Sequence, residues 1–83
     1  MYLPIGADMA VRESTVIGIF DLDTTSYDKR TRAFLSEAEQ AGEVVDVTGE
    51  LPRAFVLTSE YGMQRVYLTA LSSRALGRRM EEK

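Results

Sequence analysis

The sequence predicts a single small α+β domain, residues 1–83, with a mainly antiparallel sheet and two helices. The first observation is its length of 83 residues, which suits one domain with one thin core. The second is that short β-branched runs alternate with two longer stretches whose apolar residues have helical spacing. The third is a glycine between two strand-like runs, at the spacing of a β-hairpin. Strands and helices mixed in this order are typical of an α+β fold.

The N-terminal part is expected to be mostly extended. Apolar residues occupy 2–5 and 9–11, with a turn predicted at 6–8. Pro4 lacks an N–H group, so it belongs at the start of a strand or on a sheet edge. Residues 16–20 are almost continuously apolar, which predicts a strand that is buried on both faces.

A helix is predicted next, with Thr25 or Ser26 as its cap, and it runs to about Ala41, where Gly42 ends it. Residues spaced by three and four form its apolar stripe: Tyr27, Thr31, Phe34, Leu35, Ala38 and Ala41. A short strand at 44–47 and a loop at 48–52 should follow.

The C-terminal part predicts a hairpin and a second helix. Strands at 53–58 and 64–69 flank the turn Glu60-Tyr61-Gly62. Ser72 or Ser73 then caps the last helix. Its expected inward residues are Ala75, Leu76 and Met80, and its expected exposed residues are Arg74, Arg78 and Arg79.

The composition argues against an enzyme. The chain has no cysteine and no histidine, so it lacks the commonest general base and the commonest metal ligands. No cofactor and no metal site are therefore expected. No apolar run approaches the roughly 20 residues that span a bilayer, and the first residues lack the features of a signal peptide. We expect a cytoplasmic protein without a membrane partner.

One segment does look catalytic. The apolar run 16–20 leads into Asp21-Leu22-Asp23-Thr24-Thr25, which looks like the nucleophile motif of haloacid-dehalogenase-type phosphatases. In that motif the first aspartate attacks phosphorus, the second is the acid/base, and Mg²⁺ neutralises charge. The doubly wound sheet that supports this chemistry does not fit into 83 residues. The preferred interpretation is that these side chains cap the following turn and helix; a weak divalent-ion site at Asp21 and Asp23 is a lesser alternative.

The arginines are the stronger functional candidates. The net charge is −3, yet residues 1–50 carry four basic and ten acidic residues, whereas residues 51–80 carry five arginines and one glutamate. This division favours one basic face, which would suit nucleic acid or a second copy; alternatively, the charges scatter over the folded surface. Because guanidinium groups bind phosphates with paired donors, the candidate DNA contacts are Arg12, Arg53, Arg74, Arg78 and Arg79. The competing interpretation of the helical arginines is that they stabilise the negative helix end.

Several segments together resemble the RemA/RemB family of bacterial extracellular-matrix (biofilm) regulators, and the short RemB-like branch is the most similar. The resemblance spans residues 1 to about 80. Its pieces are Met1-Tyr2-Leu3-x-Ile5-Gly6, Ile17-Gly18-Ile19-Phe20-Asp21, Thr31-Arg32-x-Phe34-Leu35, Asp46-Val47, Leu51-Pro52-x-Ala54-Phe55-Val56-Leu57-Thr58 and Val66-Tyr67-Leu68-x-x-Leu71-Ser72-Ser73-x-x-Leu76-x-x-Arg79.

The resemblance to the RemA-like branch implies an α+β protomer that assembles into rings, binds DNA through arginines on the outer surface and activates transcription of matrix genes. Glu50 and Leu51 stand here where that branch has paired arginines, and Arg53 matches a later family arginine. Thr15 stands where the branch has another arginine, and Arg12 is the nearest basic residue.

The function expected from all this is a DNA-binding transcriptional regulator that acts as a ring-like homo-oligomer. The alternative is an oligomeric structural or protein-interaction module that has lost DNA binding. In that alternative Leu51 and Pro52 would contact a protein partner or the neighbouring subunit.

Overall fold

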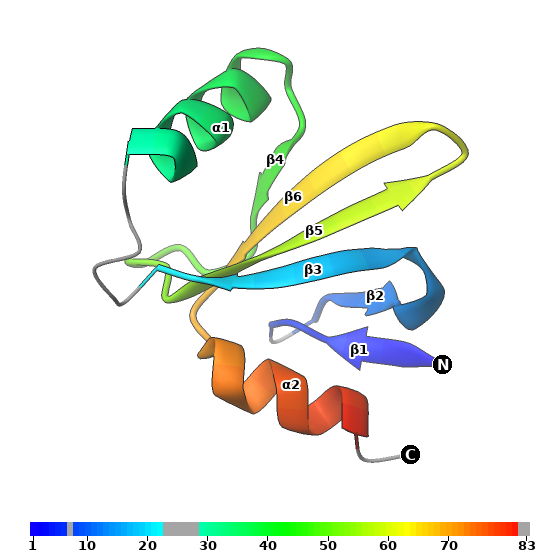
Figure 1. Ribbon diagram of the computed structural model, residues 1–83. Coiled ribbons are helices and arrows are strands. Elements are labelled where there is room, and N and C mark those ends of the chain that lie inside the picture. The colour runs from blue at the N-terminus through cyan, green and yellow to red at the C-terminus, as the bar shows by residue number, and fades with distance from the viewer. Residues whose placement is uncertain (7, 23–28, 82–83) are drawn as a thin grey trace.

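The fold is α+β, as predicted, and the part of the chain that the structure describes has strands in two sheets and two α-helices (Figure 1). The computed structural model describes residues 1–6, 8–22 and 29–81, with only the backbone of Glu81. In chain order the elements are β1 (Tyr2–Pro4), β2 (Ala10–Arg12), the 3₁₀ turn η1 (Glu13–Thr15), β3 (Val16–Asp21), α1 (Lys29–Gln40), β4 (Val44–Asp46), β5 (Ala54–Glu60), β6 (Met63–Thr69) and α2 (Ser73–Glu81).

The larger sheet has the strand order β3-β5-β6-β4, and β1 pairs with β2 in a separate two-stranded sheet. β5 runs antiparallel to both β3 and β6, whereas β4 runs parallel to β6. The mainly antiparallel prediction is therefore confirmed. The parallel pair arises because the chain crosses from β3 at one edge to β4 at the opposite edge before it returns to the centre.

Side chains alternate across the larger sheet, so each face has its own apolar core. Ala54 and Val56 of β5 face a core that β1, β2 and α2 cover. Phe55 and Leu57 of the same strand face the other way, toward α1. The sheet therefore lies between α1 on one side and the β1–β2 hairpin with α2 on the other (Figure 1).

The two ends of the chain are joined within the first of these cores. The buried Thr69 hydroxyl, at the end of β6, donates to the Ile5 carbonyl oxygen. The same hydroxyl oxygen accepts a hydrogen bond from the backbone N–H of Leu71, at 3.1 Å. The Arg79 guanidinium donates to the Pro4 carbonyl oxygen at 3.2 Å. Hydrogen bonds between residues that lie 64 and 75 positions apart in sequence thus hold the β1–β2 hairpin against the end of the chain.

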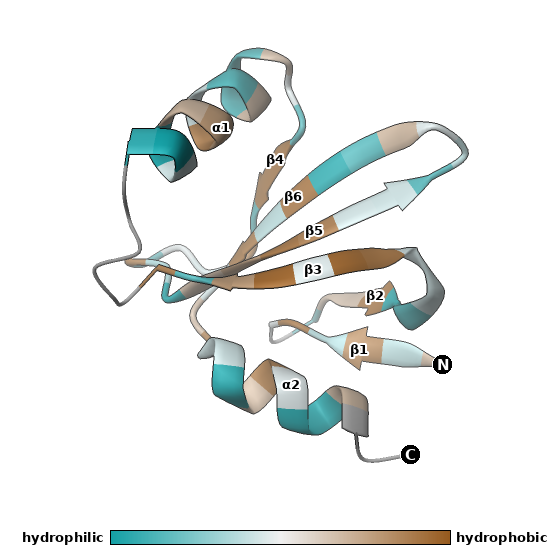
Figure 2. Cartoon of the chain, viewed as in Figure 1, coloured by the Kyte–Doolittle hydropathy of each residue, from teal (hydrophilic) through white to brown (hydrophobic). Residues whose placement is uncertain are grey.

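The strand predicted at 16–20 is present as β3, but the prediction that both its faces are buried is wrong. β3 is an edge strand, and a bulge lies between Val16 and Gly18 in its pairing with β5. Ile17, at the bulge, is 62% exposed, and Phe20 is 45% exposed. Figure 2 shows that β3 is nevertheless mostly hydrophobic. A continuous apolar run therefore belongs here to a strand at the surface of the protomer.

The first helix is confirmed as α1, whose described part begins at Lys29. The predicted caps Thr25 and Ser26, and Tyr27 of the stripe, lie outside the described residues. Phe34, Leu35 and Ala38 pack against the sheet as the stripe predicts. Ala41 is exposed, because the helix ends before it, and Gly42 follows with a positive φ of 74°, as expected of a helix-terminating glycine.

The hairpin and the last helix are confirmed with small shifts of their ends. Tyr61 and Gly62 form the turn between β5 and β6 with φ values of 54° and 76°, which is the backbone of a type I′ turn. Ser72 is the cap of α2, because its Oγ accepts the backbone N–H of Ala75 at 3.1 Å.

Candidate nucleic-acid interface

Two of the candidate arginines form an outward pair on α2. Leu76 is fully buried and Met80 packs against the same core, so these two residues define the inner side of the helix. An α-helix turns by about 100° per residue, which places Arg74 and Arg78, each two positions from Leu76, on the opposite side. Both arginines are exposed, and their Cα atoms lie about 6 Å apart along the helix axis. This spacing lets both guanidinium groups contact one backbone.

Arg79 lies on the flank of the same helix. It is three positions from Leu76, so it points sideways toward β1, where its Nη1 donates to the Pro4 carbonyl oxygen at 3.2 Å. A carbonyl oxygen carries no net charge, and a guanidinium group has five N–H donors. The exposed Arg79 therefore keeps its positive charge and has donors left for a phosphate.

Arg53 stands at the end of the sheet where α2 begins. Its backbone N–H donates to the Thr69 carbonyl oxygen at 2.8 Å, and its own carbonyl oxygen accepts the N–H of Leu22 at 2.9 Å. Thr69 ends β6 just before the cap of α2. The backbone of Arg53 is thus fixed on both sides, while the residue itself is exposed.

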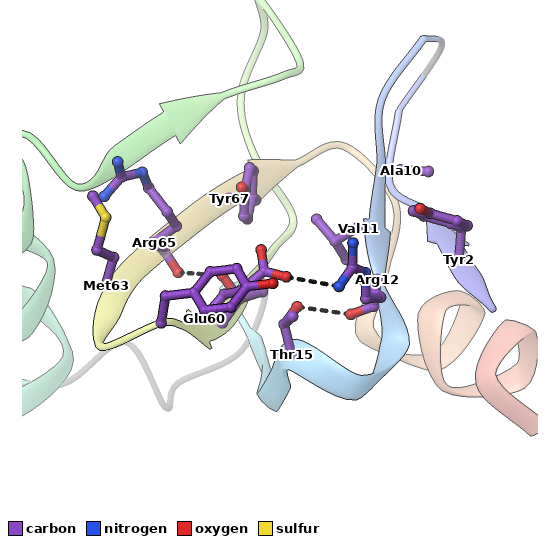
Figure 3. Close-up of a pocket in the computed structure, with 11 residues that line it drawn as sticks. Tyr2, Ala10, Val11, Arg12, Thr15, Glu60, Met63, Arg65 and Tyr67 are labelled. Atoms are coloured by element: carbon purple, nitrogen blue, oxygen red, sulfur yellow. Dashed lines mark hydrogen bonds and ion pairs between the residues drawn. The ribbon is translucent and has the colours of Figure 1, made fainter.

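The structure places Arg12 at the opposite end of β5 from Arg53. Arg12 ends β2 and forms an ion pair with Glu60, at 3.1 Å between Nη1 and Oε2 (Figure 3). Glu60 is the last residue of β5, whereas Arg53 immediately precedes that strand. At about 3.3 Å per residue, Arg53 and Glu60 therefore lie about 23 Å apart. The neighbouring Glu60 carboxylate, followed by hydrogen bonds to Tyr2 and Tyr61, raises the pKa of Arg12 above its ordinary value. Arg12 therefore keeps its positive charge, but the negative charge of the Glu60 carboxylate largely offsets it.

Arg65 is a basic residue at this end of the molecule that the sequence reasoning did not single out. It lines a cavity of about 340 Å³ with Arg12, and the cavity walls also include Tyr2, Tyr61 and Tyr67 (Figure 3). Arg65 and Tyr67 are two positions apart on β6, so they share a face of the strand. The alternation of side chains along the predicted strand could therefore have identified Arg65 as a neighbour of Tyr67. Guanidinium groups beside aromatic rings are typical of surfaces that contact nucleic acids.

The loop between β4 and β5 presents an acidic and an apolar side chain. Asp46 Oδ1 accepts the backbone N–H of Thr48 at 2.9 Å, and Gly49 has a φ of 68°, so the loop turns sharply at this point. Glu50 is exposed and Leu51 is 87% exposed. These are the positions at which the resemblance places paired arginines in the DNA-binding branch.

The other sequence candidates add no site. Asp21 ends β3, and its proposed companions Asp23 and Thr25 lie outside the described residues. Within residues 1–6, 8–22 and 29–81, no three acidic side chains are placed to hold a metal ion. The helices in that same part of the chain are too short and too polar for any of them to cross a bilayer.

A comparison with models of protein families gives a match over almost the whole chain. The family model described as "RemA-like: Extracellular matrix regulatory protein A-like" matches residues 2–80. The match therefore takes in Arg12, Arg53, the arginines at 74, 78 and 79 and the loop at 47–53. A search of curated proteins finds no match.

Proposed function

Because the chain belongs to the RemA-like family of extracellular matrix regulatory proteins, we propose that it is a bacterial DNA-binding regulator of matrix genes that acts as a ring-like homo-oligomer. The family match over residues 2–80 is the observation that carries the proposal. We also propose that the chain belongs to the short RemB-like branch, which its segments resemble, and that it is a cytoplasmic protein without enzymatic activity.

Assembly is a physical requirement of this function. The chain has a net charge of −3, so one protomer has little overall attraction for a polyanion. Each copy offers a local basic group, namely the outward pair Arg74 and Arg78, with Arg79 on the flank and Arg53 at the adjoining sheet end. A ring repeats that group at regular intervals, and weak contacts on one scaffold add up to strong binding. A curved scaffold also suits bent DNA.

The proposed contacts are with phosphates, and they differ in strength. Arg74 and Arg78 point away from the core, which makes them the principal contacts. Arg53 and Arg79 are secondary contacts, whose positions are set by backbone hydrogen bonds. Arg12 contributes least because Glu60 already pairs with it. Phosphate contacts orient a protein on DNA without reading its sequence.

The experiment is a salt titration of binding to a fluorescently labelled duplex, followed by anisotropy. The logarithm of the binding constant falls with the logarithm of salt concentration, with a slope of about −0.9 per phosphate neutralised. Replacing Arg74 and Arg78 by glutamine should weaken binding to every duplex and make the slope shallower by about one for each lost contact. Lys29→Gln, on α1, removes one exposed positive charge away from the proposed surface and is the control.

Two results would contradict DNA binding by these residues. One is that the assembled protein retains no duplex even at about 50 mM salt, where phosphate contacts are strongest. The other is that the double glutamine variant has the same slope as the Lys29→Gln control.

A second function is favoured by one observation, the loop that carries Glu50 and Leu51. An acidic residue and a leucine that is 87% exposed suit a protein contact better than a phosphate contact. Under this alternative the chain is an oligomeric protein-interaction module without DNA binding. It would retain no duplex at low salt, and Leu51→Asp would abolish capture of a purified partner protein while the fold stays intact.

A further inference from the structure

The cavity between the β1–β2 and β5–β6 hairpins gathers aromatic and cationic side chains (Figure 3). Its volume is about 340 Å³, which is at the lower end of the roughly 300–1,000 Å³ that small-ligand sites occupy. Tyr2 and Arg12 come from the first hairpin, whereas Tyr61, Arg65 and Tyr67 come from the second. Three of the four tyrosines of the chain thus meet two of its arginines. We call this hollow the tyrosine–arginine cavity.

Tyr61 is the lining residue that the requirements of the fold explain least. Its φ of 54° lies in the left-handed region, which glycine and asparagine adopt more readily than a bulky residue does. Its side chain is 90% exposed, so packing in the core does not compensate for this backbone. A hydrogen bond with Arg12 turns the side chain toward the cavity. An unfavourable backbone without compensating burial is typical of functional positions.

The two arginines differ in the partners that they already have. Arg12 forms the ion pair with Glu60 at 3.1 Å. Arg65 donates from Nη1 to the carbonyl oxygen of Gln64 at 3.1 Å, and among the described residues it has no carboxylate partner. A guanidinium group has five N–H donors, so Arg65 keeps its charge and several donors. Arg65 is therefore the group available to an anion, whereas Arg12 is engaged within the cavity wall.

The floor of the cavity is closed and its polar group is satisfied. Val11 and Thr58 lie at the bottom, and each is only 5% exposed. The Thr58 hydroxyl donates to the backbone carbonyl oxygen of Arg65 at 3.3 Å, which holds the strand that carries this arginine. A closed floor, aromatic walls and a free guanidinium group suit a ligand that joins a flat ring to an anionic group.

We propose that the tyrosine–arginine cavity binds a nucleotide, whose base stacks on Tyr61 and whose phosphate contacts Arg65. Aromatic side chains stack on any base, and guanidinium groups bind phosphate with paired donors. The cavity is small, so it takes one nucleotide rather than a base pair. A base within a duplex is already stacked, and freeing it costs energy. The nucleotide is therefore either free in solution or unpaired in a strand. The site lies on the two hairpins, apart from the α2 arginines proposed to bind duplex DNA.

The test is isothermal titration calorimetry of the full chain with the four nucleoside 5′-monophosphates. The matching nucleosides and inorganic phosphate are titrated for comparison. A monophosphate makes both contacts, so it should bind at least about tenfold more tightly than either part alone. A single-stranded tetranucleotide identifies the source of the ligand. Affinity for the strand at least about tenfold above that for the monophosphate assigns the site to an unpaired strand, and equal affinity assigns it to the free nucleotide.

Two variants separate the phosphate contact from the base contact. Arg65→Gln should weaken monophosphate binding at least about tenfold and leave nucleoside binding nearly unchanged. Tyr61→Asn should weaken binding of monophosphates and nucleosides alike, at least about fivefold, because the stacking ring is lost. Tyr61→Phe keeps the ring and should retain the affinity. Lys29→Gln, on α1, removes one positive charge away from the cavity and is the control.

Thermal unfolding by circular dichroism checks that each variant folds; Tyr61→Asn in particular should melt no lower than the wild type, because asparagine suits the turn. The proposal is overturned if neither the monophosphates nor the single strand binds at millimolar concentrations. It is also overturned if Arg65→Gln and Tyr61→Asn bind like the Lys29→Gln control, or if inorganic phosphate binds as tightly as the monophosphates.

The outcome is distinguishable from that of the proposed DNA function. A double replacement of Arg74 and Arg78 by glutamine should leave monophosphate binding unchanged, because these residues lie on α2. If the wild type binds monophosphates through Arg65 and Tyr61 but retains no duplex, the DNA function fails and the nucleotide site stands. If it retains duplex but binds neither monophosphates nor single strands, the nucleotide site is wrong and the DNA function stands.

Discussion

Replacing Leu76 by alanine tests whether α2, which carries three of the candidate arginines, is held by the core as described. Leu76 is fully buried with Leu3, Ile5 and Val11 as members of the same core. Truncating a buried leucine to alanine typically costs 2–5 kcal/mol, because transfer energy is lost and a cavity is left. Domains have stabilities of roughly 0.05–0.15 kcal/mol per residue, or about 4–12 kcal/mol for a chain of this length. A loss of about 3 kcal/mol is therefore a large fraction of the total.

Urea unfolding followed by circular dichroism measures this loss. With an m-value of about 1 kcal/mol/M for a small domain, a loss of about 3 kcal/mol should lower the midpoint by about 3 M. Measurements at several protomer concentrations separate the protomer's stability from that of its assembly. Met63→Ala is the matched control, because Met63 is 54% exposed and its truncation should cost about 0.5 kcal/mol or less. A loss below about 1 kcal/mol for Leu76→Ala would refute the packing of α2 on β1 and β3.

Three smaller changes give further tests. Ser72→Ala removes the cap bond to the Ala75 N–H and should cost about 1 kcal/mol, seen as a lower Tm, with Ser72→Asp close to the wild type; equal Tm values would contradict the cap. Tyr61→Asn should raise the Tm, because asparagine tolerates the φ of 54° better than tyrosine; a lower Tm would mean that the contact of Tyr61 with Arg12 matters more. Glu60→Gln should leave the urea midpoint almost unchanged and make it less dependent on salt. Because Glu60 raises the pKa of Arg12, the ion pair stabilises the fold below that pKa and is lost only in strong alkali. The difference in urea midpoint between the wild type and Glu60→Gln should therefore stay constant between about pH 6 and 9. A pH-dependent difference in that window would contradict the pairing.

The elements that sequence predicted well are those specified by local chemistry. Ser72 caps a helix with its own hydroxyl, Gly42 ends one with a positive φ, and Gly62 closes a tight hairpin. Each of these choices depends on a few neighbouring residues, so the sequence pattern is sufficient. The outward side of α2 was predicted for the same reason, because helical periodicity alone separates Arg74 from Leu76.

The features that sequence reasoning missed depend on which strands become neighbours. The exposure of Ile17 and Phe20 follows from the edge position of β3, and nothing in an apolar run states whether a second strand will cover it. The pairing of Arg12 with Glu60 joins residues that are far apart in sequence, so the number of arginines did not reveal that one of them is already paired with a carboxylate. The stacking of Phe55 on Phe20 and Phe34 likewise needs three separate elements to meet.

The hydrogen bonds that join Ile5 to Thr69 and Pro4 to Arg79 have a consequence for how the chain is made. Ile5 and Pro4 receive these partners only after Thr69 and Arg79 have been synthesised, because the contacts span 64 and 75 positions. Until then the growing chain cannot seal this core, and a deletion at either terminus removes a wall of the same interior. Distant pairing of this kind slows folding, so a nascent chain keeps this core open to misassociation until Arg79 has been synthesised.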